Sequence, residues 1–125
     1  MKKISIVALL LASTSFAHAQ KFSGVPVANL TNVAQAIKTA RGTLAWASCN
    51  NPNSSVEYLQ FFDSIGTITV GTTAPKFWLP VNASLVQYFA NLDVIYLAGL
   101  QVAFTTTPAG GAAPSSNAQC SFGVN

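Results

Sequence analysis

The segment from Phe61 to Val81 reads FFDSIGTITVGTTAPKFWLPV, and it decides the fold class of the chain. Apolar and polar residues alternate with a period of two at residues 67–70 and again at residues 76–81, as they do in strands with one buried face. Glycine and proline separate these runs, and both residue types are typical of turns. The segment therefore predicts a strand, a turn, a short strand, a second turn and a third strand in a half-buried antiparallel sheet.

Runs of the same kind continue on both sides of this segment. They lie at residues 43–48, 56–62, 85–89, 94–97, 100–105 and 119–124. Residues 106–117 are mostly small and turn-forming, so we expect a loop there. About seven or eight short strands at near-regular spacing predict an all-β chain, folded as a single antiparallel β-sandwich of the jelly-roll or immunoglobulin-like type.

Two segments at the start of the domain are harder to assign. Residues 20–30 contain Gly24 and Pro26 and have no sustained period, so we expect an irregular N-terminal arm. Residues 31–41 begin with Thr31, which suits a helix cap, and contain good helix formers, yet they also alternate as a strand does. We favour the strand because the surrounding pattern is all strand, and we place the β-sandwich domain at residues 31–125.

Residues 1–19 have the features of a secretory signal peptide. Two lysines follow Met1, residues 4–12 are mainly apolar, and residues 17–19 read Ala-His-Ala, a small-x-small cleavage site. The alternative is a retained N-terminal anchor, but the apolar run is short for a membrane span. We expect export from the cytoplasm to the periplasm or the medium, and no membrane association after cleavage.

The remaining chain is nearly neutral. Beyond residue 19 it holds four cationic side chains and three carboxylates, namely Lys21, Lys38, Arg41 and Lys76 with Glu57, Asp63 and Asp93. The cations form no cluster along the chain, so the footprint of a nucleic-acid-binding protein is absent. Low charge gives little electrostatic resistance to association. Protein partners, including further copies of this chain, are therefore expected.

Cys49 and Cys120 are the two cysteines. In an exported protein a disulfide is the expected state, worth roughly 4 kcal/mol in the chain-entropy model. A metal pair or a catalytic thiol is disfavoured, because no histidine remains after residue 19 to complete a zinc site or activate a thiol. Cys49 is out of phase with Leu44 and Trp46, so we expect it just past a strand end, in the Asn-Asn-Pro-Asn turn.

No constellation of catalytic or metal-binding residues is found. Glu57, Asp63 and Asp93 are the only carboxylates beyond residue 19, and the last two lie in turn-like sequence. Residues 71–73 are not followed by the Gly-Lys-Ser/Thr of a phosphate loop. We therefore expect no enzyme activity, no cofactor and no bound metal.

Aromatic residues supply the candidate interaction surface, which we assign to Trp78, Tyr58 and Phe62. Exposed aromatic faces stack on sugar rings, although aromatic residues in small sheets more often fill the core. Trp78 is the best candidate for exposure, because it alternates with Phe77 and Leu79 and faces outward if those two face the core.

The chain resembles small β-sandwich proteins encoded in tailed bacteriophages and prophages. The resemblance rests on an aromatic strand ending in Phe62-Asp63, on GTTAPKF at residues 71–77, on the GGAAP loop at residues 110–114 and on Gly-Thr-Leu at residues 42–44. It covers residues 33–124 and implies a virion-associated structural role, as a capsid decoration, tail or fibre-type component, without catalytic residues. The alternative is a periplasmic or secreted binding module for carbohydrate or a partner protein.

Overall fold

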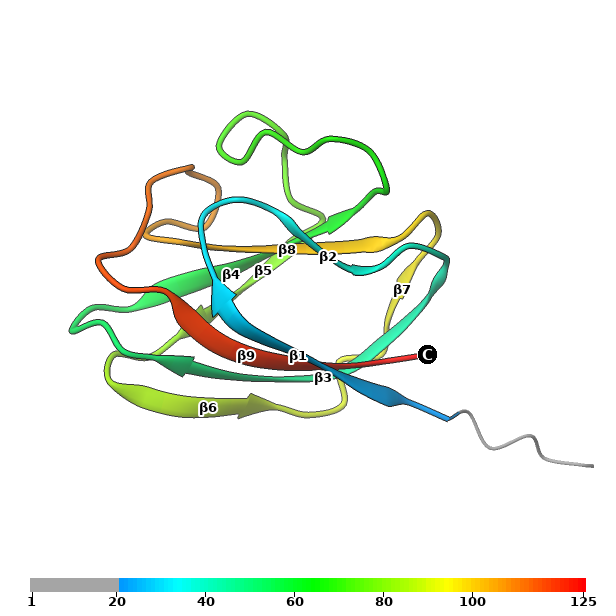
Figure 1. Cartoon of the computed structure of the whole chain (residues 1–125), viewed down its shortest axis with the longest axis horizontal. Coiled ribbons are helices and arrows are strands. Elements are labelled where there is room, and N and C mark those ends of the chain that lie inside the picture. The colour runs from blue at the N-terminus through cyan, green and yellow to red at the C-terminus, as the bar shows by residue number, and fades with distance from the viewer. Residues whose placement is uncertain (1–20) are drawn as a thin grey trace, which may run out of the picture.

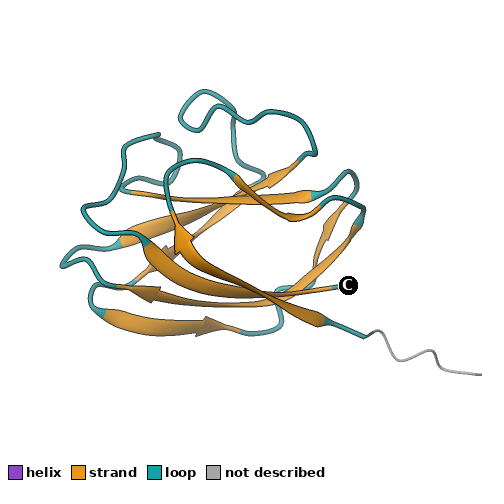
Figure 2. Cartoon of the chain, viewed as in Figure 1, coloured by secondary structure: helices purple, strands orange, loops and turns teal. Residues whose placement is uncertain are grey.

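The computed structural model describes residues 21–125 as two antiparallel β-sheets that pack face to face (Figures 1 and 2). This confirms the predicted all-β sandwich, with nine strands rather than seven or eight. The strands are β1 (Ser23–Leu30), β2 (Gln35–Lys38), β3 (Gly42–Asn51), β4 (Glu57–Asp63), β5 (Phe77–Val81), β6 (Leu85–Phe89), β7 (Val94–Tyr96), β8 (Leu100–Thr105) and β9 (Ala118–Val124). The predicted signal peptide lies outside the described residues. Within residues 21–125 no helix is long and apolar enough to cross a membrane.

The strand order identifies the type of sandwich. Sheet A has the order β1-β9-β3-β6, with β7 also on β3, and sheet B has the order β2-β8-β4-β5. β6 and β7 pair with successive parts of β3, so they act as two halves of one edge strand. With β6 and β7 counted as one strand, β1 pairs with β9, β2 with β8, β3 with β6 and β7, and β4 with β5. This nested pairing is the jelly roll, the first of the two predicted sandwich types.

Aromatic and branched side chains from the inner faces of both sheets fill the core. The Phe61 ring stacks on the Phe77 ring of the neighbouring strand, with centroids 4.3 Å apart. It also meets the Phe122 ring of the other sheet edge-on, at 6.0 Å. Further large, fully buried side chains of this core are Leu30, Leu44, Leu59, Val81, Tyr96, Leu100, Val102 and Phe104. The two sheets are therefore held together by direct side-chain packing across their inner faces.

A β-bulge in β3 overturns two expectations about the faces of that strand. Its register on β9 shifts between Leu44 and Trp46, so one extra β3 residue is inserted there. Leu44 consequently lies in the core, whereas Trp46 lies on the outer face and does not share its side. The same shift brings Cys49 to the inner face. Cys49 is thus inside the strand and not in the turn after it, and the predicted conflict of phase disappears.

The expected irregular arm at residues 20–30 is wrong, because most of it forms β1. Ser23 to Val27 pair with the closing strand β9, and such a long-range partner cannot be read from a local period. β1 lies at the edge of sheet A, where proline is tolerated because one side of the strand makes no ladder bonds. Val25 and Val27 pack on the core while Pro26 faces outward. The sandwich domain therefore begins before residue 31.

Two other local assignments have opposite outcomes. Residues 31–41 do contain a strand, β2, whose Ile37 is buried in the core, so tertiary pairing with β8 outweighs helix propensity. Residues 67–70, in contrast, are not a strand. They belong to a long loop, residues 64–76, with only an isolated bridge between Val70 and Thr73. Gly71 has a φ of 90° and its backbone lies against Gly111, so the chain turns there to meet another loop.

Candidate binding surface

The three aromatic residues predicted to form an interaction surface are not all exposed. Trp78 is 46% exposed, as its alternation with inward-facing Phe77 and Leu79 predicted. Its ring meets Tyr58 of the neighbouring strand edge-on, with centroids 5.6 Å apart. Phe62, however, is only 2% exposed. Trp78 and Tyr58 form a small pair at the edge of sheet B, and Phe62 is removed from the surface.

Phe62 is buried because the chain covers the outer face of sheet B with its own loops. Residues 64–76 and the first part of the loop 106–117 lie over that face, on the side away from sheet A (Figure 1). Gln60 projects outward and its amide donates to two carbonyls of the second loop, at 3.0 and 2.8 Å. Gln101 donates in the same way to two carbonyls of the first loop, at 3.0 and 2.7 Å. Two buried glutamines therefore fasten the loops to the sheet.

The outer face of sheet A has no such cover from residues 21–125 (Figure 2). The strand register places the outward side chains in rows across β1, β9, β3 and β6. One row runs through Gly24, Gly123 and Trp46; the next through Pro26, Ser121, Ser48 and Tyr88; the third through Gln119, Asn50 and Val86. None of these side chains carries a charge. We call this set the sheet A face.

Trp46 and Tyr88 form an aromatic pair on the sheet A face. The indole lies over Gly123: a Cβ built there would come within 2.0 Å of Nε1 of Trp46. The far end of the indole reaches Gly24, where a Cβ would be 3.6 Å away. The Tyr88 ring is 5.9 Å from the Trp46 ring, its plane is inclined by 38°, and the residue is 61% exposed. Gly123 thus lets the indole lie flat on the sheet, whereas a Cβ at Gly24 would only make an ordinary contact with its far end.

A shallow hollow of about 500 Å³ lies beside this pair. Its walls are formed by Pro26 of β1 and by Val86 of β6, which is 71% exposed. Four polar side chains, Ser48, Ser121, Asn50 and Gln119, stand on its floor, which we call the polar floor, although most of the accessible lining is apolar. Small hydroxyls at the centre make the floor low, and two amides at one end can both donate and accept hydrogen bonds.

The sequence pattern did contain a signal for this face. In the last strand, residues 119, 121 and 123 alternate with the inward-facing Cys120, Phe122 and Val124, and they are small or polar. That alternation indicates that the outward face of β9 carries no large apolar side chain. Trp46 and Tyr88 are among the aromatic residues that could stack on sugars, but neither was assigned to the predicted surface. The β3 bulge reverses the apparent side of Trp46, and the partner of Tyr88 on β3 lies forty residues away in sequence.

Each carboxylate of residues 21–125 has a separate, local environment. Asp63 accepts hydrogen bonds from the backbone N–H groups of residues 97–99, at 2.9 to 3.4 Å, and from the Lys76 ammonium at 3.0 Å. Desolvation acts to raise the pKa of Asp63, but these donors together hold it well below its usual value. Glu57 is buried and accepts a 2.6 Å bond from Ser55, and Asp93 is exposed. In this part of the chain no three His, Cys, Asp or Glu side chains gather as metal ligands would.

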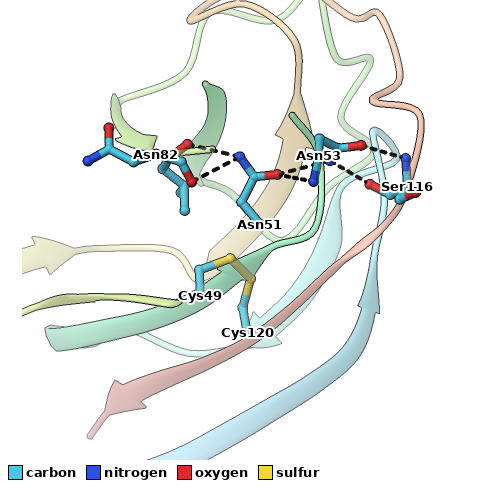
Figure 3. Close-up of a disulfide and its surroundings, with 7 residues drawn as sticks. Cys49, Asn51, Asn53, Asn82, Ser116 and Cys120 are labelled. Carbon is cyan, nitrogen blue, oxygen red and sulfur yellow. Dashed lines mark hydrogen bonds between the residues drawn. A yellow bond between two sulfur atoms is a disulfide. The ribbon is translucent and has the colours of Figure 1, made fainter. Parts of the chain in front are cut away.

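Cys49 and Cys120 form the predicted disulfide (Figure 3). They face each other on the paired strands β3 and β9 and are buried in the core. Beside them the amides of Asn51 and Asn53 form a polar junction: Asn51 donates to the Val81 carbonyl, and Asn53 exchanges two bonds with the Ser116 backbone. The predicted turn thus fastens β3 to β5 and to the loop before β9. A buried disulfide indicates an oxidising, exported environment.

Scans of protein-family models, curated proteins and solved structures match none of them to this chain. No relative therefore assigns a role to any residue, and the functional proposals rest on the geometry of the sheets, loops and side chains described above.

Proposed function

We propose that the protein is an exported, non-enzymatic interaction module whose working surface is the sheet A face. The observation that carries this proposal is the difference between the two sheets. Sheet B has most of its outer face covered by two fastened loops, whereas sheet A presents an uncharged face with an aromatic pair, partly buried Trp46 and exposed Tyr88. Exposed apolar groups gathered on one face are typical of interaction sites.

The carboxylates support a non-enzymatic role. Asp63 is fully engaged by backbone donors and Lys76, and it holds the turn before β8 in place. Glu57 is buried at the start of β4, so it is not accessible to a substrate. A glycosidase-type pair of carboxylates would flank one accessible point, and these do not. The disulfide and the predicted signal peptide support a location in the periplasm or the medium.

Amide chemical-shift mapping tests the proposal on the oxidised protein released from its signal peptide. Spectra are recorded over a concentration series and with soluble polysaccharides and peptides added in turn. We expect changes at Ser48, Ser121 and Tyr88, in the middle row of the sheet A face. Changes confined to the edge of sheet B around Trp78, or no change under any condition, would contradict the proposal.

A second candidate function is a self-assembling structural protein of the virion type, as the resemblance implies. Jelly rolls are common in viral capsid proteins, which is an analogy of fold only. The specific observation in its favour is β5, which pairs only with β4 and carries the exposed Trp78 along its open edge. Light scattering behind size exclusion separates the two candidates. A closed assembly that persists on dilution favours the structural role, and a monomer favours the binding module.

A further inference from the structure

We propose that the sheet A face binds a neutral polysaccharide chain, which stacks on Trp46 and Tyr88 and is hydrogen-bonded by the polar floor beside them. This inference rests on the proposed function and names the ligand class of the same surface. It follows from three features, namely the aromatic pair, the polar floor and the absence of charge from the face.

The aromatic pair provides the stacking surface. One side of the Trp46 indole is set against Gly123 and Gly24, so its orientation is fixed before any ligand arrives. The C–H groups on a pyranose face are slightly positive, and an aromatic ring presents a negative face to them. The inclination of 38° between the Trp46 and Tyr88 rings suits a single chain, whose successive sugars turn relative to each other.

The polar floor provides the hydrogen bonds. Sugar hydroxyls donate and accept, and so do the side chains of Ser48, Ser121, Asn50 and Gln119. Within residues 21–125 these four side chains make no hydrogen bonds to other protein groups, so they remain available to a ligand. The hollow of about 500 Å³ falls in the range of ordinary small-ligand sites, about 300–1,000 Å³.

The same arrangement disfavours a protein partner or a second copy of this chain. Protein interfaces place apolar side chains at the centre and polar ones at the rim. Here the centre is Ser48 and Ser121, and the large apolar groups Trp46, Tyr88 and Val86 lie toward the sides. A chain of linked rings fits this distribution, because its rings stack at one end and its hydroxyls meet the floor. The lack of charge favours a neutral polysaccharide over an acidic one.

Affinity electrophoresis tests the inference. The oxidised protein runs in native gels containing hydroxyethylcellulose, barley β-glucan, xylan or galactomannan, with heparin as the charged comparison. We expect at least one neutral polymer, and not heparin, to retard the protein. Tyr88→Ala should weaken the retardation about fivefold, since an aromatic contact is worth on the order of 1 kcal/mol. Trp78→Ala removes an aromatic residue from the other sheet and should leave retardation unchanged.

A matched glycine pair tests the role of Trp46 without removing it. Gly123→Ala places a methyl group within 2.0 Å of the indole and must lift the ring off the sheet. Gly24→Ala, in the same row, places one at an ordinary 3.6 Å. We expect the first substitution to weaken retardation at least tenfold and to change the tryptophan emission. The second should retain wild-type retardation. Thermal unfolding confirms that each variant is folded.

Two results would overturn the inference: no retardation by any of the four neutral polymers, or retardation that Tyr88→Ala and Gly123→Ala leave intact. The proposed function is judged separately from the shift mapping. If no polymer binds while self-association or peptide binding maps to the sheet A face, the ligand class is wrong and the surface is right. If all shifts map to sheet B, both proposals fail.

Discussion

Replacing Asp63 with asparagine should destabilise the protein by about 2 kcal/mol at neutral pH. The side chain is 18% exposed. It accepts hydrogen bonds from the backbone N–H groups of residues 97–99 and from the Lys76 ammonium. Hydrogen bonds to a charged acceptor are worth about 1 kcal/mol more than neutral ones, and two of the backbone bonds are short. The ion pair with half-exposed Lys76 adds about 0.5 kcal/mol. The NH2 group of asparagine would also point toward one of these backbone N–H groups or toward the Lys76 ammonium, and it cannot accept a hydrogen bond from either.

The pH dependence of this effect has a definite sign. The folded state holds the pKa of Asp63 below that of the unfolded chain, which is about 3.9. The unfolded state therefore binds more protons as the solution is acidified. The stabilisation by Asp63 is fully present above about pH 5 and is lost progressively as the pH falls below about 4. The gap between wild type and Asp63→Asn should accordingly narrow on acidification.

Thermal unfolding followed by circular dichroism from pH 7 to pH 2 measures both effects. At pH 7 we expect Asp63→Asn to lower Tm by about 10 °C. Asp93→Asn is the matched control, because it removes one carboxylate at an exposed position whose φ of 46° asparagine tolerates. The reasoning is refuted if the two variants unfold alike at pH 7, or if the deficit of Asp63→Asn is unchanged at pH 2.

Three further predictions concern the disulfide and the aromatic residues of sheet B. Replacing both Cys49 and Cys120 with alanine should cost roughly 4 kcal/mol in urea unfolding, for a separation of 71 residues; a loss below about 1 kcal/mol would contradict the chain-entropy account. Phe62→Ala should cost about 3 kcal/mol, because it empties a buried site under the loop of residues 64–76. Trp78→Ala should cost less than about 1 kcal/mol, since the ring is half exposed. A larger loss of stability for Trp78→Ala than for Phe62→Ala would contradict the burial of Phe62 and the exposure of Trp78.

Local alternation was sufficient to predict the strands whose side chains meet the core directly. Phe77 and Leu79 pack inward and Trp78 outward, as the two-residue period requires. Alternation failed at residues 67–70, where the same pattern lies in a loop. A period of two indicates that one side of a segment is apolar, but it does not show whether a partner strand exists. β1 is the converse case, because β9 supplies the partner that its weak local pattern did not reveal.

The sequence and the structure favour different residues for the candidate site. Exposed aromatic residues and carbohydrate were considered from the sequence, yet the residues chosen were Trp78, Tyr58 and Phe62 of sheet B. Phe62 has the correct parity for an outer face and is nevertheless buried, because the loop of residues 64–76, which follows β4 directly, folds back over it. Covering loops and bulges are tertiary features. A single residue inserted in β3 turns Trp46 to the outer face of sheet A, and no local sequence pattern predicts this insertion.

The glycine beneath Trp46 argues that the sheet A face is shaped for contact. Glycine within a strand costs about 0.5–1 kcal/mol relative to alanine, so Gly123 is not explained by strand stability. Its effect is to let an indole lie flat where any side chain at Gly123 would lift it away. A flat, immobile indole loses little further freedom when a ligand stacks on it, which favours binding. The covered face of sheet B needs no such arrangement, and there the glutamines fasten loops instead.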